Sequence, residues 1–162
     1  MGPPKLILVH CLLALPLLGR DAGLAALRGR ARAGEAAAQF ELGDRCHFGR
    51  GVPRNPAEAA QWYRLAAEQG HAGAQLNLGN AYLRGEGLAR NPVEGYAWLA
   101  LAAAQGQPGA EMNRALAAGQ GQPGAETNRA LAAKNLSVIE LRLAEARARD
   151  LQRVVSMRKG RG

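Results

Sequence analysis

The chain contains few of the residues that build sheets, disulfide scaffolds or cysteine metal sites. Aromatic residues make up 4% of its 162 positions, and β-branched residues are scarce. Because pleated surfaces select β-branched and aromatic side chains, this composition disfavours a β-rich fold and favours helices. The two cysteines, Cys11 and Cys46, lie in unlike contexts and form no CxxC pair. We therefore expect neither a disulfide framework nor a zinc motif.

The body of the chain also lacks an excess of charge. The formal net charge is +8, but residues 35–134 carry equal numbers of basic and acidic side chains. The excess is divided between residues 1–34 and residues 135–162. A nucleic-acid-binding solenoid concentrates basic residues within its repeats, along the groove that follows the phosphates. The distribution therefore argues against nucleic acid as the main partner, and solubilising termini explain the charge.

An internal repeat is the main positive feature of the sequence. Residues 38–73 align with residues 74–109 without a gap, and 17 of the 36 positions are identical. Such self-similarity at a fixed period indicates two copies of one structural unit stacked in an array. Each unit reads as a helix, a loop and a second helix, and we expect the first helices at residues 36–48 and 72–84.

Glycine and asparagine mark the ends of these helices. Glycine adopts the left-handed conformation of a helix end at low cost, and the pairs Gly49/Gly51 and Gly85/Gly87 end the first helices. The second helices begin at Asn-Pro-x-Glu, where asparagine caps the helix and proline suits its first position. The glutamates Glu58 and Glu94 are predicted to complete capping boxes. Gly70 and Gly106 end the second helices.

Several apolar residues recur between the units and predict the core. Trp62 and Trp98 are equivalent, and each can bury on the order of 200 Å². We expect both to anchor the stack, together with the pairs Leu42/Leu78, Leu65/Leu101 and Ala66/Ala102. Gly43 and Gly79 lie inside the first helices, where glycine is unfavourable, so we expect a partner helix to approach closely there.

The pattern of these residues resembles the Sel-1-like repeat, a relative of the tetratricopeptide repeat. The first unit carries it in Leu42-Gly43, Gly49-x-Gly51-Val52, Ala59, Trp62-Tyr63, Ala66-Ala67 and Gly70-His71-Ala72-x-Ala74. The second carries Leu78-Gly79, Tyr82, Gly85-x-Gly87, Trp98 and Ala102-Ala103. The resemblance covers about residues 34–118, with one departure, Cys46 at the position of Tyr82. It implies a short right-handed α/α solenoid of antiparallel helix pairs that serves in protein–protein interaction, without catalytic residues.

The domain organisation follows from the repeat register. Residues 1–21 form an apolar N-terminal segment, and residues 22–118 form the repeat domain with an N-terminal capping helix at 22–33. The domain contains two full units and a partial third that begins at Pro108. Residues 119–134 are a tandem-duplicated insertion, because residues 106–118 reappear as 121–133 with a single change. Residues 135–162 form a closing helix and a basic tail.

The closing helix begins at a further capping box, Ser137-x-x-Glu140, and runs to about Met157. We expect its apolar face to pack on the third unit through Leu136, Ile139, Leu143 and Ala146. Arginines at 142, 149 and 153 lie on another face. They are either solvated or in contact with an acidic protein, nucleic acid or anionic lipid.

The N-terminal apolar run Leu6–Leu18 is too short to span a bilayer and has the length of a signal-peptide core. Arginines follow it, and the clean cleavage pattern Ala31-Arg32-Ala33 lies far downstream, within the expected capping helix. Two interpretations stay open: export with cleavage of this segment, or a retained segment that is buried or associated with a membrane in the region of residues 6–18.

No catalytic constellation emerges from the sequence. Cys46 and His47 are neighbours, but adjacent helical residues point in different directions, so Cys46 is expected to pack in the core. His71 lies in the turn between the units, where a structural role is expected. The glycine pairs follow helices, not strands, and therefore do not form a phosphate-binding loop. The sequence predicts no cofactor, no metal and no small-molecule substrate.

A binding surface is predicted on the first helices of the two units. In tetratricopeptide-like stacks these helices line the concave face. Positions that the repeat leaves free there share a spacing of three and then four residues, which places them on one helix face: Glu41, Asp44 and Phe48, and their equivalents Asn77, Asn80 and Arg84. We expect them to contact an as yet unidentified protein, with Phe48 as an apolar anchor. The alternative is a structural spacer whose basic termini contact a membrane or nucleic acid.

Overall fold

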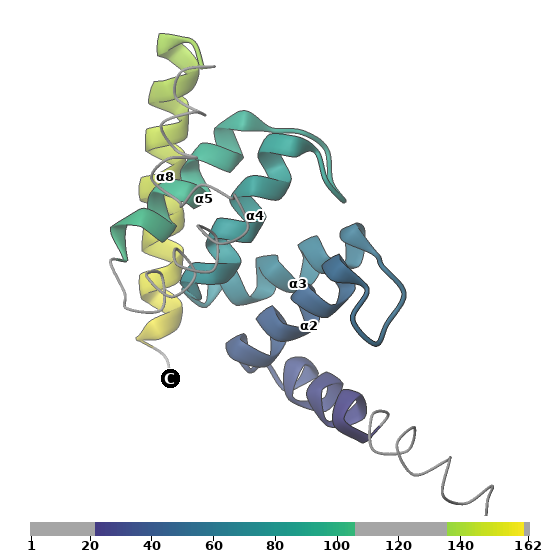
Figure 1. Ribbon diagram of the computed structural model, residues 1–162. Coiled ribbons are helices and arrows are strands. Elements are labelled where there is room, and N and C mark those ends of the chain that lie inside the picture. The colour runs from purple at the N-terminus through teal and green to yellow at the C-terminus, as the bar shows by residue number, and fades with distance from the viewer. Residues whose placement is uncertain (1–21, 106–135, 161–162) are drawn as a thin grey trace, which may run out of the picture.

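The computed structural model describes residues 22–105 and 136–160, and their regular secondary structure is entirely helical. The order along the chain is a helix over residues 22–32, α2 (Ala36–Phe48), α3 (Pro56–Glu68), α4 (Ala72–Arg84), α5 (Pro92–Ala104) and α8 (Val138–Lys159). Consecutive helices pack side by side, so that α2 pairs with α3 and α4 pairs with α5 (Figure 1). The long helix α8 lies against α5 at one end of the molecule. The all-helical solenoid expected from the repeat is confirmed.

The ends of the repeat helices agree with the sequence expectation. Both first helices end at a glycine in the left-handed conformation, Gly49 with φ 71° and Gly85 with φ 69°. Both second helices begin after an asparagine whose side chain accepts the backbone N–H three residues later, from Glu58 in α3 and from Glu94 in α5. The local signals of cap and stop residues therefore set the four helices.

Only one of the two hydrogen bonds of the expected capping box is present at α3 and at α5: the asparagine side chain accepts from the glutamate N–H. The backbone N–H of Asn55 donates to the Cys46 carbonyl at 2.8 Å, and that of Asn91 donates to the Tyr82 carbonyl at 2.9 Å. Because these N–H groups already have partners in the preceding helix, the glutamates do not fold back onto them. Glu58 instead accepts from the indole of Trp62. At Ser137 the full capping box is present, as expected.

Close helix contacts explain the glycines inside α2 and α4. A Cβ added at Gly43 would lie 2.7 Å from the ring of Tyr63 in α3, and one added at Gly79 would lie 2.7 Å from Leu99 in α5. Each glycine thus lets the second helix of its own unit approach the first. The expectation of a close approach at both positions is confirmed.

The two tryptophans differ in their burial. Trp98, Leu101 and Ala102 are buried, whereas the equivalent Trp62 is only partly buried and Leu65 is 42% exposed. Both tryptophans therefore contribute to the core, Trp98 within it and Trp62 packed against it from the side. The neighbours of the two helices account for the difference. Helix α8 packs along α5 but contacts α3 much less, so the outer side of α3 has less cover.

Buried glutamines connect each unit to the helix before it. Gln75 donates to the Ala67 carbonyl at 3.0 Å and accepts from Gln105 at 2.6 Å, and thereby joins α3, α4 and the end of α5. The first unit repeats this arrangement with Gln39, which donates to the Ala31 carbonyl and accepts from Gln69. The contact with Ala31 ties the helix over residues 22–32 to α2 in the same way that α3 is tied to α4.

The face that α8 buries differs from the expected one. Ala144, Leu151 and Val155 are buried, while Ile139 and Leu143 are exposed and Ala146 is partly buried. Helix α8 packs on α5, whereas the third unit on which it was expected to pack lies outside the described residues. The helix has apolar residues on two sides, roughly a third of a turn apart, so its sequence did not determine which side faces the protein.

Other expectations also fall on residues that the structure does not describe. These are the apolar segment 1–21, the partial third unit from Pro108, the duplicated insertion 119–134 and the last two residues. Within the described ranges, none of the helices is both long enough and apolar enough to cross a membrane.

Candidate functional site

A pocket opens between the two repeats, near the C-terminal ends of α2 and α4. Helix α2 contributes His47 and Phe48. Helix α3 contributes an apolar part of the wall through Pro56 and Ala60. The complete lining is His47, Phe48, Pro56, Ala60, Tyr63, Asn77, Asn80, Ala81, Arg84 and Glu86. Four of the six residues predicted to bind a partner, namely Phe48, Asn77, Asn80 and Arg84, are in this lining. The pocket thus lies at the junction of the two repeats.

Asp44, a fifth predicted residue, lies behind this lining and serves the fold. Its carboxylate accepts a hydrogen bond from the Tyr63 hydroxyl at 2.7 Å and another from the Asn77 amide at 3.2 Å. Burial raises the pKa of Asp44 above its ordinary value, although the hydrogen bond from Tyr63 opposes the shift. Burial and the neighbouring Asp44 carboxylate likewise raise the pKa of the Tyr63 hydroxyl, which stays protonated. The network joins α2, α3 and α4.

Phe48 forms an apolar rim on the pocket. Its side chain is 46% exposed. Its ring meets the His47 ring edge to face, with the ring centroids 4.6 Å apart, and the Arg50 guanidinium carbon lies 4.6 Å from the Phe48 centroid. An exposed aromatic ring held by two neighbours is preorganised for contact with an apolar group. The equivalent position of the second repeat is Arg84, so the two sides of the junction differ in chemistry.

Within the described residues, some charged side chains around the pocket form ion pairs and others do not. Glu86 pairs with Arg54 at 2.7 Å and lies 4.0 Å from the His47 imidazole. Glu41, the sixth predicted residue, pairs with Arg45 on the surface of α2 and is not part of the lining. Arg84 is exposed and forms no ion pair or hydrogen bond within residues 22–105 and 136–160. Its guanidinium is the charged group of the pocket that is available to a ligand.

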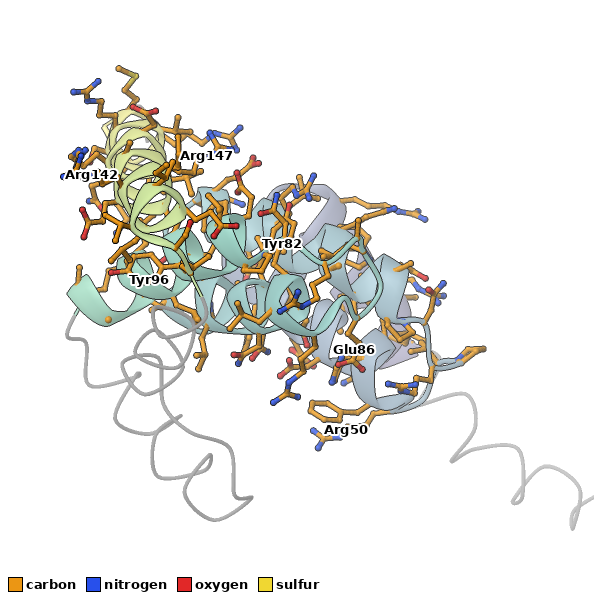
Figure 2. The ribbon with its side chains drawn as sticks, turned by 90° about the horizontal axis from the view of Figure 1, so that it is seen from above. Arg50, Tyr82, Glu86, Tyr96, Arg142 and Arg147 are labelled. Atoms are coloured by element: carbon orange, nitrogen blue, oxygen red, sulfur yellow. The ribbon has the colours of Figure 1, made fainter. Side chains whose placement is uncertain are left out.

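Residues that sequence reasoning missed complete the pocket. Tyr63 and Glu86 were overlooked because one belongs to the repeat pattern and the other to a loop expected only to end a helix. The difference between Arg50 and Glu86 at equivalent positions of the two repeats is a signal that could have identified the latter. Figure 2 shows Arg50 and Glu86 at the end of the molecule opposite Arg142 and Arg147 of α8.

The structure also places the residues considered for catalysis. Cys46 is buried in the core, and burial raises the pKa of its thiol. His71 caps α4 by accepting the Ala74 N–H at 3.2 Å, and its ring stacks on Phe40 with centroids 4.4 Å apart. Burial lowers the pKa of His71. Both side chains act in packing and capping. In the described part of the chain, no three His, Cys, Asp or Glu residues gather as a metal-binding group.

Comparison with known proteins agrees with the repeat seen in the sequence. The Sel1 repeat model matches residues 36–71 and 72–107. A protective antigen of uropathogenic Escherichia coli strains, described as displaying an SLR fold, has a TM-score of 0.68 and 32% identity over 83% of this chain. A Sel1 repeat protein from Oxalobacter formigenes has a TM-score of 0.51 and 38% identity over 52% of it.

The extent of these similarities is limited. The alignments cover 26% and 25% of the two solved chains, so this chain corresponds to about a quarter of each. No curated protein matches it in sequence. Sel1 repeats are generally scaffolds for protein–protein interaction.

Proposed function

Because the chain contains two Sel1 repeats, we propose that it binds a protein partner through the pocket between them. The partner contributes a short segment that lies across the C-terminal ends of α2 and α4. In this proposal the chain is a binding module and not an enzyme. Phe48 and Arg84 form the exposed contact surface, Asn77 and Asn80 lie in the wall of the pocket, and Asp44 holds that surface in place.

The observation that carries the proposal is the convergence of variable positions from both repeats on one pocket. An exposed aromatic ring, two amide side chains and an available guanidinium line the same hollow. Aromatic residues and arginine are the residue types that most often dominate binding energy at protein interfaces. Asparagine amides can donate to and accept from the backbone of a bound segment. The pocket therefore offers one exposed apolar and one exposed charged contact, beside the partly buried Asn77 and the buried Asn80.

A displayed peptide library tests the proposal with segments of many different sequences. The intact chain is immobilised, bound peptides are selected, and their affinities are compared for the wild type, Phe48→Ala and Arg84→Ala. We expect each substitution to weaken the selected peptides by about tenfold or more, since hot-spot truncations cost on the order of 2 kcal/mol.

Two matched substitutions serve as controls for these variants. Leu65→Ala removes an apolar side chain that is exposed to a similar degree on α3, and Arg142→Ala removes an exposed arginine on α8. Both controls should leave the affinity unchanged. Peptides that bind all variants equally, or a selection that enriches no peptide, would contradict the proposed pocket.

A further inference from the structure

Exposed apolar side chains are concentrated on the last helix. Of the seven large hydrophobic residues that are exposed in the described part of the chain, five belong to α8. Four of them lie on one side of it, with exposed fractions between 42% and 73%: Ile139, Leu143, Val154 and Met157. We call these four residues the α8 stripe.

Helix geometry places the α8 stripe about 115° around the helix from the face that packs on the repeats. Ile139 and Met157 are separated by five full turns and therefore align along the helix. Ala144, Leu151 and Val155, which are buried, lie on the packed face. The stripe extends over about 27 Å, from the rise of 1.5 Å per residue. The α8 stripe protrudes from the surface of a terminal helix. A partner must therefore surround side chains that project from a convex surface.

Basic residues flank the α8 stripe along one edge. Arg142, Arg149 and Arg153 are exposed and follow one another at helical spacing. Arg153 lies 3.8 Å from Asp150, while Arg142 and Arg149 form no ion pair within the described residues. Arg147 differs, since it reaches Glu94 of α5 at 2.6 Å. In Figure 2, Arg142 and Arg147 leave α8 on different sides.

We propose that α8 docks the protein on an anionic lipid bilayer. The α8 stripe enters the boundary between headgroups and acyl chains, and the three arginines contact anionic headgroups beside it. A helix that combines an apolar side with a basic edge lies in the plane of a membrane interface. Helix α8 is not apolar enough to cross a bilayer, so it lies on the surface. One carboxylate, that of Asp150, lies on the same face as the stripe, between Leu143 and Val154. The Arg153 guanidinium lies 3.8 Å from it, and this ion pair lowers the cost of placing Asp150 among the headgroups.

The charges and shape favour a bilayer over other occupants. If two copies paired through their stripes in antiparallel orientation, the arginine edges would face each other, and like charges in contact are unfavourable. Phosphates of nucleic acid would satisfy the arginines but leave the apolar side chains in water. A rigid protein surface would need a groove of matching length, whereas the fluid bilayer interface accommodates convex apolar side chains without one.

Sedimentation with lipid vesicles tests the proposal on the intact chain. The probes are vesicles of phosphatidylcholine alone and vesicles in which roughly a third of the lipid is anionic phosphatidylglycerol. We expect binding to the anionic vesicles and a decrease of about tenfold or more for Ile139→Gln/Leu143→Gln and for Arg142→Gln/Arg149→Gln/Arg153→Gln.

Matched variants distinguish this surface from general effects of charge and apolarity. Leu65→Gln removes an apolar side chain elsewhere, and Arg28→Gln/Arg32→Gln/Arg50→Gln produces the same net charge with α8 intact. Both should bind as the wild type does. Circular dichroism checks that each variant stays helical.

Two results would overturn the proposal: no binding of the wild type to anionic vesicles, or binding that the α8 variants retain, which would place the contact in another part of the chain. A change of oligomeric state in Ile139→Gln/Leu143→Gln, measured by sedimentation equilibrium, would identify the stripe as a contact between copies instead.

Discussion

The Asp44 carboxylate accepts a hydrogen bond from the Asn77 amide, although the two residues belong to different repeats and lie 33 positions apart. The Tyr63 hydroxyl donates to the same oxygen, so one carboxylate holds together three helices beside the pocket. A residue that the repeat pattern leaves variable is therefore a structural connection. The second repeat has Asn80 at the equivalent position, which suggests a direct test of what Asp44 contributes.

Substitution of Asp44 should separate its acceptor oxygen from its charge. Asp44→Ala leaves the buried Tyr63 hydroxyl without its partner and should lower the free energy of unfolding by about 1–3 kcal/mol. Asp44→Asn keeps an acceptor oxygen and removes the charge that burial disfavours, so its effect should be clearly smaller. Urea denaturation followed by circular dichroism measures both. Glu41→Ala, which removes only a surface ion pair, is the control, and equal losses in all three variants would contradict this assignment.

Two equivalent glycines should respond differently to substitution by alanine. Gly51 and Gly87 have nearly the same backbone conformation, with φ 74° and 76°. Alanine at either position adds about 1–2 kcal/mol of backbone strain. At Gly87 the added Cβ would also overlap the carbonyl group of Pro56, while at Gly51 its nearest neighbour is the Arg45 guanidinium at 3.9 Å.

Gly87→Ala should therefore lower the free energy of unfolding by about 1–3 kcal/mol more than Gly51→Ala does. Thermal and urea denaturation of the two variants provide the comparison. Equal stabilities would show that the loop of the second repeat does not press against the start of α3.

The buried glutamines should contribute strongly to the free energy of unfolding, although they are polar. Gln75→Ala removes the donor to the Ala67 carbonyl and the acceptor for Gln105, and it leaves a cavity between three helices. We expect a loss of about 2–4 kcal/mol in the free energy of unfolding. The exposed Gln61 on α3 provides a control, since Gln61→Ala should change stability by less than about 0.5 kcal/mol. A neutral Gln75→Ala would mean that water replaces both hydrogen bonds.

The cap at the start of α4 should make stability depend on pH. His71 accepts the Ala74 N–H through Nδ1, which requires a neutral ring, and its pKa in the folded protein is lower than the ordinary 6.5. Between these two pKa values the unfolded chain binds the proton more tightly. The contribution of His71 is therefore complete above pH 6.5 and decreases as the pH falls below that value.

His71→Asn keeps a good capping side chain that does not titrate. The difference in the free energy of unfolding between the variant and the wild type should therefore shift in favour of the variant as the pH falls from 7.5 to about 5, the range over which the ring of an ordinary histidine titrates. Urea denaturation at several pH values measures this difference. A difference that is constant with pH would show that the His71 ring does not act as the acceptor.

The site was only partly accessible to sequence reasoning. Helix periodicity grouped Phe48 with α2 and Arg84 with α4 as residues of one surface, and both line the pocket. It could not distinguish Asp44, which is held by Tyr63, from Glu41, which lies on the surface. That distinction depends on a second helix whose contact residues are far away in the sequence. The role of the six predicted residues in binding stays a prediction.

Local sequence patterns were sufficient to predict the repeat helices and their order. The repeat, the asparagine caps and the stop glycines act within a few residues of the chain, so their consequences can be read locally. Tertiary structure decided which apolar faces are covered. Trp98 is buried and Trp62 only partly so, although both occupy the same repeat position, because α8 packs along α5 and reaches little of α3. In the same way α8, with apolar residues on two sides, buries Ala144, Leu151 and Val155 and exposes Ile139 and Leu143. The burial of a helix face depends on which other helix packs against it. Periodicity within one helix does not identify that other helix.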